Sequence, residues 1–269
     1  MLATQRRARI VEVVTRAGAA RVADLVGELG VSDMTIRRDI DQLAARGVLE
    51  RVHGGAVAVG APSGVEPSSD EPGFRVKSAL MTRQKQAIAA AAAAFVEPGM
   101  SIGISAGTTT YELARAIRAV RDLTVVTNSV PVAQLLHEAA TPGQVVVLTG
   151  GVRTPSDALV GPVADAALRT LHVDLLLLGA HGVDPRAGLT TPNLVESQTN
   201  RALVGCGRRT CVLADHTKFG VVGLSSFLDL AGVDVLVTDD ELPAAVRAPV
   251  ADVVGELLLA DTRRPEATR

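Results

Sequence analysis

Six short apolar runs alternate with helical patterns along the last two thirds of the chain, and this alternation limits the fold more than any other feature. The runs are MSIGIS, LTVVTNS, QVVVLTGG, VDLLLLGAHG, RTCVLADHTKFG and VDVLVTDD. Most are rich in Val, Leu or Ile and end in small polar residues. Continuous apolar runs of this length are typical of strands that are buried on both faces of a parallel sheet. The pattern therefore predicts an open α/β domain.

Helical patterns separate several of these runs, and they cover 111–120, 132–139, 163–171 and 194–206. Right-handed crossovers bring the carboxyl ends of parallel strands to one edge of the sheet, so the polar residues at the strand ends are expected to line that edge. The alanine-rich stretch 87–96 is predicted to be a buried helix, because it is far shorter than the roughly 20 residues of a membrane span.

Composition indicates a packed chain whose charge acts locally. The 269 residues are 47% hydrophobic with a formal net charge of −2, so any contact with nucleic acid has to be local. The start, MLATQRRARI, lacks the apolar core of a signal peptide, and we expect a soluble cytoplasmic protein with no membrane partner. Cys206 and Cys211 have neither a second pair nor a nearby His cluster. They are expected to be buried free thiols, and no metal or cofactor is predicted.

Proline, glycine, serine and acidic residues crowd the stretch 60–73, and no apolar periodicity continues through it. Such a composition is typical of a linker or flexible loop. The sequence therefore predicts a separate N-terminal domain over 1–58, a linker over 59–74 and an α/β domain over 75–260.

Three helical patterns fit residues 4–46. Gly30 stops the second, and Ser32 is a good N-cap for the third, in which Ile36, Ile40 and Leu43 recur at helical spacing. Two short amphipathic helices joined by a glycine turn form the helix-turn-helix pattern. After the third helix, VLERVHGGAVAV alternates in the manner of a two-stranded wing.

The third helix and the wing carry the residues expected to contact DNA. In this motif the second helix of the pair, here the third helix of the chain, enters the major groove with its N-terminal half. Arginine can contact guanine there or hold a phosphate. The alternative is a small helical domain with solvated arginines, one of which pairs with Asp39 or Asp41. The agreement of cap, turn, apolar spacing and basic wing favours DNA binding. The candidate DNA-contacting residues are Ser32, Thr35, Arg37, Arg38, Arg51 and His53.

SAGTTT, residues 105–110, stands where a predicted strand meets a helix. Free N–H groups and the helix dipole at such a point favour an anion, and Gly107 permits close approach of the backbone. The alternative is a tight turn between strand and helix in which a threonine caps the helix, because it would have the same sequence pattern. The signal alone is weak, because it matches neither the Walker lysine loop nor the dinucleotide fingerprint. Other strand ends strengthen it: TNS, TGG, and a turn that holds Asp215 and Lys218.

Both halves of the chain resemble the DeoR family of bacterial transcriptional regulators. VS-x-x-TIRRD followed by R-x-HGGA is similar to the hallmark of the family's winged helix-turn-helix. From about Lys85 to Asp239, the pieces SAGTTT, LTVVTNS, LTGG, LVGP, GLTT and LADHTKFG resemble its sensor domain. The resemblance implies a fold similar to ribose-5-phosphate isomerase and glucosamine-6-phosphate deaminase, and a phosphorylated sugar as effector. It implies that the effector pocket is lined by Gly107, Thr108, Thr109, Thr127, Asn128, Gly150, Gly151, Asp215 and Lys218.

One position departs from the family pattern. The family usually has an aspartate two residues before the glycine of the Gly-Thr-Thr motif, and here that residue is Ser105. Serine is neutral and shorter, so a less hydroxylated or more acidic ligand is a possible effector.

The resulting hypothesis is a regulator, not an enzyme: a repressor of a carbohydrate-utilisation operon that binds double-stranded operator DNA as a homo-oligomer, a dimer or a tetramer. One rival is a sugar-phosphate isomerase or deaminase with a DNA-binding appendage and Asp215 or Glu196 as its base. Another is a DNA-binding protein whose α/β domain only oligomerises.

Overall fold

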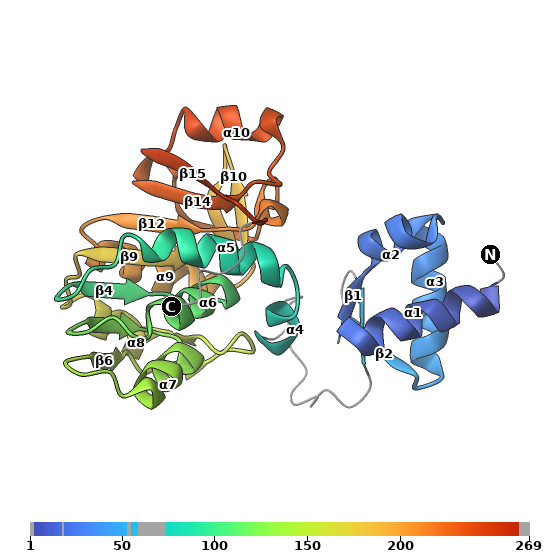
Figure 1. Cartoon of the computed structure of the whole chain (residues 1–269), viewed down its shortest axis with the longest axis horizontal. Helices are drawn as coiled ribbons and strands as arrows, with labels where there is room; N and C mark the ends of the chain where they lie inside the picture. Colours follow the sequence, from blue (N-terminus) through green and yellow to red (C-terminus); the bar gives the residue numbers. More distant parts are fainter. Residues whose placement is uncertain (1–2, 18, 53–54, 59–73, 264–269) are drawn as a thin grey trace. The chain divides into compact units, whose positions relative to one another are not determined.

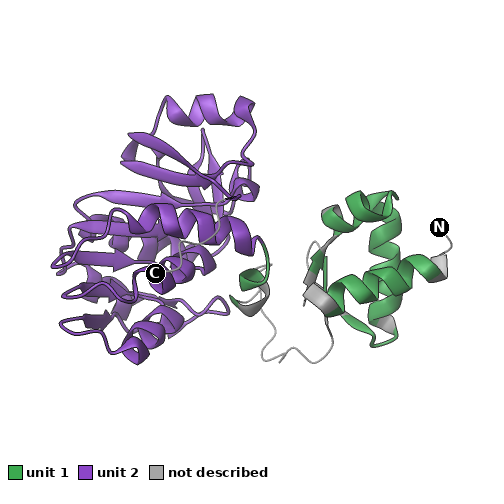
Figure 2. Ribbon diagram, viewed as in Figure 1, with its two compact units in different colours: residues 1–80 green, residues 81–269 purple. Residues whose placement is uncertain are grey.

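The computed structural model describes residues 3–17, 19–52, 55–58 and 74–263. The chain divides into two compact units, unit 1 over 1–80 and unit 2 over 81–269 (Figures 1 and 2). Of the predicted linker, 59–74, residues 59–73 lie outside the described residues and Phe74 is the first residue of a short helix, and the predicted domain boundaries stay predictions. In the part of the chain that the structure describes, no helix is long and apolar enough to cross a membrane.

Unit 1 packs helices against a small antiparallel sheet. Its elements are α1 (Ala3–Ala17), β1 (Ala19–Arg21), α2 (Val22–Leu29), α3 (Asp33–Ala45), β2 (Leu49–Val52), β3 (Gly55–Ala58) and α4 (Phe74–Ser78). The strand order is β1-β3-β2. Ile10, Leu25, Ile36 and Ile40 are at most 1% exposed and form the centre of its core. The predicted helices and wing are confirmed, and β1 adds a third strand that the sequence pattern did not indicate.

Unit 2 is built on a parallel sheet of seven strands in the order β15-β14-β12-β9-β4-β5-β6. All six predicted apolar runs contribute a strand to it, and β15 is an addition. Its elements are α5 (Thr82–Ala93), β4 (Ser101–Ile104), α6 (Thr108–Ile117), β5 (Thr124–Thr127), α7 (Val130–Ala139), β6 (Val145–Leu148), β7 (Val152–Arg153), β8 (Leu159–Val160), α8 (Pro162–Leu168), β9 (Leu175–Gly179), β10 (Gly182–Asp184), β11 (Gly188–Thr191), α9 (Leu194–Cys206), β12 (Thr210–Leu213), β13 (Ser225–Leu228), β14 (Val235–Asp239), α10 (Ala244–Ala251) and β15 (Glu256–Ala260).

The central strands divide their side chains between two cores. Leu175 and Leu177 of β9 belong to the core that α5, α6 and α7 cover, whereas Leu176 and Leu178 belong to the core under α8, α9 and α10. This division follows from the period of two in a strand, and it explains why the runs are apolar at every position. Unit 2 is thus a three-layer α/β/α domain, and the predicted open α/β fold is confirmed.

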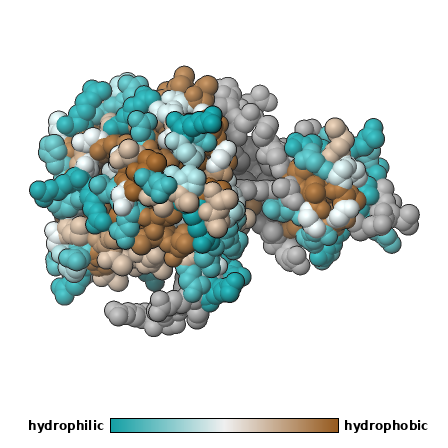
Figure 3. Space-filling view, turned by 90° about the horizontal axis from the view of Figure 1, so that it is seen from above, coloured by the Kyte–Doolittle hydropathy of each residue, from teal (hydrophilic) through white to brown (hydrophobic). Residues whose placement is uncertain are grey.

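A second sheet of order β10-β11-β13 packs on the α9 side, and β7 and β8 form a short hairpin. Apolar side chains also reach the surface of unit 2. The face drawn in Figure 3 has brown patches among the teal. Among the large apolar residues of unit 2, Val152 at 71% and Leu224 at 74% are the most exposed described ones.

Candidate functional site

The first candidate site is the exposed side of α3. Ile36, Ile40 and Leu43 hold the opposite side of this helix in the core of unit 1. Ser32 caps the helix as predicted, since its Oγ accepts the backbone N–H of Thr35 at 3.4 Å and lies 2.8 Å from the Thr35 hydroxyl. Two of the predicted DNA-contacting hydroxyls therefore also fix the first turn of the helix.

The two neighbouring arginines of α3 differ in their surroundings. Arg37 pairs with Asp33, one turn earlier, and this hydrogen bond holds the pKa of Asp33 below its usual value. The alternative reading of the sequence paired one of the two arginines with Asp39 or Asp41 instead. Arg38 is exposed and has no hydrogen bond or ion pair to any described residue. Arg38 is therefore the more available of the two for a base edge or a phosphate.

Asp39 is a buried anchor instead. It is 3% exposed, and its two carboxylate oxygens accept from Arg6 at 2.5 Å and Arg7 at 2.9 Å. The pair of arginines on α1 thereby ties that helix to α3. Sequence reasoning missed this role because Arg6 and Arg7 lie more than 30 residues away.

The wing residues are described only in part. Arg51 lies on β2, which pairs with β3 in antiparallel register, but its side chain is not among the described groups. His53 lies outside the described residues. Their predicted contacts to DNA stay predictions.

The second candidate site lies at the carboxyl edge of the parallel sheet in unit 2. β4 leads through α6 to β5 on one side, and β9 leads to β12 on the other, so the strand order reverses between β4 and β9. Ligands of open α/β sheets bind at such a switch point. Ser105 lies there at 2% exposure, and its Oγ accepts the backbone N–H of Gly179 at 2.9 Å. The unusual serine thus joins the ends of the two neighbouring strands β4 and β9.

The N-terminus of α6 follows directly and presents free donors. Gly107 is the N-cap residue at φ 152°, a conformation almost confined to glycine. The first intrahelical donor is Tyr111, whose N–H bonds to Gly107 O. The N–H groups of Thr108, Thr109 and Thr110 precede it, and they donate to no group within the described ranges. Together with the helix dipole they form a concentration of positive potential.

Thr127 and Asn128 brace the loops around that helix end. The Thr127 hydroxyl donates to Ile104 O at 2.7 Å and accepts from the Ser129 N–H. Asn128 is 1% exposed; it accepts the Ala106 N–H at 2.8 Å and donates to Leu159 O at 3.1 Å. Both side chains are therefore occupied by backbone groups from adjacent loops.

The glycines after β6 meet the same edge. Gly151 has φ 117°, and a Cβ there would lie 2.6 Å from Val160 O, so a larger residue would require a backbone shift. The N–H of Thr149 donates to Thr127 O, which places this loop beside that of β5.

Asp215 and Lys218 lie on a 3₁₀ turn after β12, His216–Lys218. Asp215 is 1% exposed, and its Oδ1 accepts both the N–H and the hydroxyl of Thr217. Lys218 is half-buried. Three strands separate β12 from β6, which is about 19 Å at ordinary interstrand spacing. The predicted pocket residues thus line one edge of the sheet. Those after β6 and those after β12 are too far apart to contact one phosphate together.

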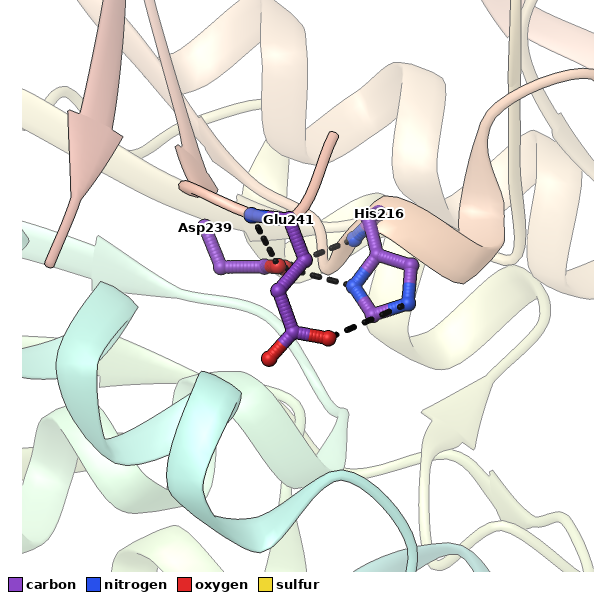
Figure 4. A group of neighbouring side chains, drawn as sticks. All are labelled: His216, Asp239 and Glu241. Carbon is purple, nitrogen blue, oxygen red and sulfur yellow. Dashed lines mark hydrogen bonds and ion pairs between the residues drawn. The ribbon is translucent and has the colours of Figure 1, made fainter. Parts of the chain in front are cut away.

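Sequence reasoning missed a cluster beside this turn, His216, Asp239 and Glu241 (Figure 4). Asp239 is fully buried and accepts from His216 Nδ1 at 2.7 Å and from the backbone N–H groups of His216 and Glu241. His216 Nε2 lies 3.9 Å from Glu241 Oε2, and Glu241 Oε1 accepts from Gln84. His216 Nε2 and Glu241 Oε2 are the two atoms of the cluster that make no hydrogen bond to a described residue. A zinc site uses three or four protein ligands. The acidic residues that end the run VDVLVTDD were the one sequence feature that could have indicated this cluster.

The two cysteines are free and buried, as expected. Burial raises the pKa of Cys206 to about 11 and that of Cys211 to about 12. Thiolates, the reactive form, are therefore scarce at both positions near neutral pH.

Two family models match the chain: the DeoR-like helix-turn-helix domain over 6–60 and the DeoR C terminal sensor domain over 80–240. The HTH-type transcriptional regulator GlpR of Haloferax volcanii is 36% identical, over 93% of this chain and 95% of its own. A relative from Escherichia coli O157:H7, which bears the name of an aga operon transcriptional repressor, is 34% identical over 90% of this chain and 88% of its own.

Among solved structures, ribose 5 phosphate isomerase A from Neisseria gonorrhoeae aligns with 55% of this chain and 56% of its own at a TM-score of 0.38 and 18% identity. The family matches confirm the regulator hypothesis over the enzyme alternative, since the curated relatives above are regulators over nearly their whole length. The chain belongs to the DeoR family of helix-turn-helix transcriptional regulators.

Proposed function

We propose that the protein represses a carbohydrate-utilisation operon and that a phosphorylated sugar, bound at the carboxyl edge of unit 2, changes its affinity for operator DNA. The N-terminus of α6 carries this proposal. Three N–H groups that donate to no described residue gather there with the hydroxyls of Thr108 and Thr109, at the switch point of the sheet. A phosphate dianion is the ligand that such a helix end favours. The relative named for the aga operon supports the link to an operon.

The phosphate contacts the loop from Gly107 to Thr109, and the sugar extends toward the ends of β9 and β12. Asp215 and Lys218, on the 3₁₀ turn after β12, are the contacts expected on the β12 side. Gly150 and Gly151 lie on the opposite, β6 side, where their positive φ values let the backbone turn sharply after the strand. Thr127 and Asn128 contribute indirectly, because their side chains hold the loops in position.

Thermal unfolding with a panel of phosphosugars tests this proposal. Ribose 5-phosphate and glucosamine 6-phosphate are included, each beside its unphosphorylated form. A ligand at 100 times its dissociation constant stabilises the protein by about 2.7 kcal/mol, which shifts the melting temperature visibly. Thr108→Ala is expected to reduce the shift. Thr124→Ala, an exposed threonine at the amino end of β5, is the matched control. A panel without any shift would favour a unit 2 that only oligomerises.

For unit 1 we propose that α3 enters the major groove and that Arg38 is its principal arginine. Gel shifts on operator DNA test this with Arg38→Ala and Arg37→Ala. Both variants are expected to bind more weakly, and Arg38→Ala by the larger factor, because loss of a bidentate arginine–guanine contact costs about 1–3 kcal/mol. Arg121→Ala, an exposed arginine of unit 2, is the control. Unchanged affinity in both α3 variants would contradict the assignment.

We propose a homo-oligomer, a dimer or a tetramer, acting in the cytoplasm. Helix-turn-helix proteins commonly read two half-sites with two-fold symmetry. The exposed apolar side chains of unit 2 supply surface for such contacts. Light scattering after gel filtration measures the mass directly, and a single species at the 27.8 kDa of one chain would contradict the proposal.

A further inference from the structure

The outer face of α3 carries an apolar side chain, Met34, beside Arg38. Ile36 and Ile40 point into the core of unit 1 at no more than 1% exposure. Met34 and Arg38 are four residues apart and hence on one face of the helix. Each is two residues from Ile36, which places that face on the side away from the core.

Met34 is exposed to solvent, unlike most large apolar residues of unit 1. Among the described residues of unit 1, two large apolar side chains are exposed, Met34 at 75% and Val48 at 44%. Met34 is the second residue of α3, in the turn that Ser32 and Thr35 fix. Asp33, beside it, is already paired with Arg37. The carboxylate next to Met34 is therefore already paired with a cation.

The major groove offers one apolar feature on its base edges, the C5-methyl group of thymine. Methionine is flexible and polarisable, so it can follow such a group closely. We infer that Met34 contacts a thymine methyl group and thereby selects a T·A pair next to the position that Arg38 reads. This inference rests on the proposed role of α3 as the recognition helix.

The test begins with operator DNA selected from a random-sequence pool by the full-length wild-type chain. Each thymine of the selected site is then replaced singly by uracil, which differs only in lacking the methyl group. At one thymine per half-site the wild type is expected to bind about fourfold more weakly, the effect of one buried methyl group. Met34→Ala is expected to bind the thymine and uracil sites equally at that position and to respond as wild type elsewhere.

Two variants serve as controls. Val48→Ala removes an exposed apolar side chain from the same unit and is expected to keep the full methyl effect. Met34→Leu keeps an apolar side chain of similar size and is expected to keep most of it. Circular dichroism checks that every variant is folded.

Two results would overturn the inference: no thymine whose methyl group matters, or the same methyl effect in Met34→Ala as in wild type. Its failure is distinguishable from failure of the recognition helix. If Arg38→Ala weakens binding while Met34→Ala leaves the methyl effect intact, only the role of Met34 is wrong. If neither variant alters binding, the assignment of α3 itself is wrong.

Discussion

The two candidate sites use their polar side chains in opposite ways. On α3 of unit 1, Arg37 and Arg38 are exposed and lie outside the core. At the carboxyl edge of unit 2, Thr127, Asn128 and Asp215 are at most 1% exposed and bond to nearby backbone groups. The first site displays side chains, whereas the second uses side chains to position backbone donors. Substituting Arg37 or Arg38 should therefore alter binding, whereas substituting Thr127, Asn128 or Asp215 should alter folding. One residue of α3 is an exception.

The exception is Asp39, which gives the largest expected effect. Asp39→Ala leaves Arg6 and Arg7 without their buried partner, and breaking a buried pair in this way costs about 3–5 kcal/mol. Urea unfolding followed by circular dichroism measures the loss. Asp33→Ala is the matched control, since it removes an exposed aspartate that also pairs with an arginine of α3. Equal stability of the two variants would show that burial does not distinguish these pairs.

Asn128→Ala tests unit 2 in the same terms. The substitution leaves the Ala106 N–H and Leu159 O without partners in a buried site, and each such group costs about 1–3 kcal/mol. The midpoint of urea unfolding is expected to fall accordingly. Thr108→Ala removes a hydroxyl that has no partner among the described residues, so it should leave stability unchanged. If Asn128→Ala is as stable as wild type, the bracing role is wrong.

Asp33→Asn is expected to strengthen DNA binding by a few-fold. The change removes a negative charge from the first turn of α3 and frees Arg37. One added arginine–phosphate contact steepens the dependence of log affinity on log salt by about 0.9. A salt titration of operator affinity measures the slope. Asp24→Asn, an exposed aspartate on α2, is the control. An unchanged slope would mean that freeing Arg37 from Asp33 adds no phosphate contact.

The smallest expected effect concerns the cysteines. A thiol is protonated below its pKa, so raising the pKa of Cys206 to about 11 lowers its thiolate fraction at every pH below that value. At pH 9, where an ordinary thiol is half ionised, about 1% of Cys206 is thiolate by the same equilibrium. Alkylation of the native protein at pH 9 should be slow and should accelerate after unfolding. Fast labelling of the folded chain would contradict the burial of these thiols.

Sequence reasoning recovered the fold of both units because each rests on local periodicity. Six apolar runs predicted six strands of the parallel sheet, and the glycine turn before Ser32 predicted the helix pair. β1 was missed because three residues carry too little pattern. β15 was missed because ELLLA follows a helix that a proline interrupts, and only its pairing with β14 identifies it as a strand.

The candidate sites could be predicted in residue type but not in role. Polar strand ends indicated the edge at Ser105 and Asn128, yet their bonds to Gly179 and Ala106 depend on neighbours 74 and 22 residues away. The same limit concealed the partners of Asp39 and the cluster of His216 with Asp239. Pairings across such sequence distances follow from tertiary packing, which no local pattern encodes.

The division of each central strand between two cores constrains how this family of proteins can diversify. Deleting one residue from β9 would exchange Leu176 with Leu177 and move every following side chain to the opposite core. Change inside the strands is therefore penalised twice, once in each core. The loops at the carboxyl edge do not pack into both cores. New ligand preferences can therefore evolve there while the sheet beneath them stays constant.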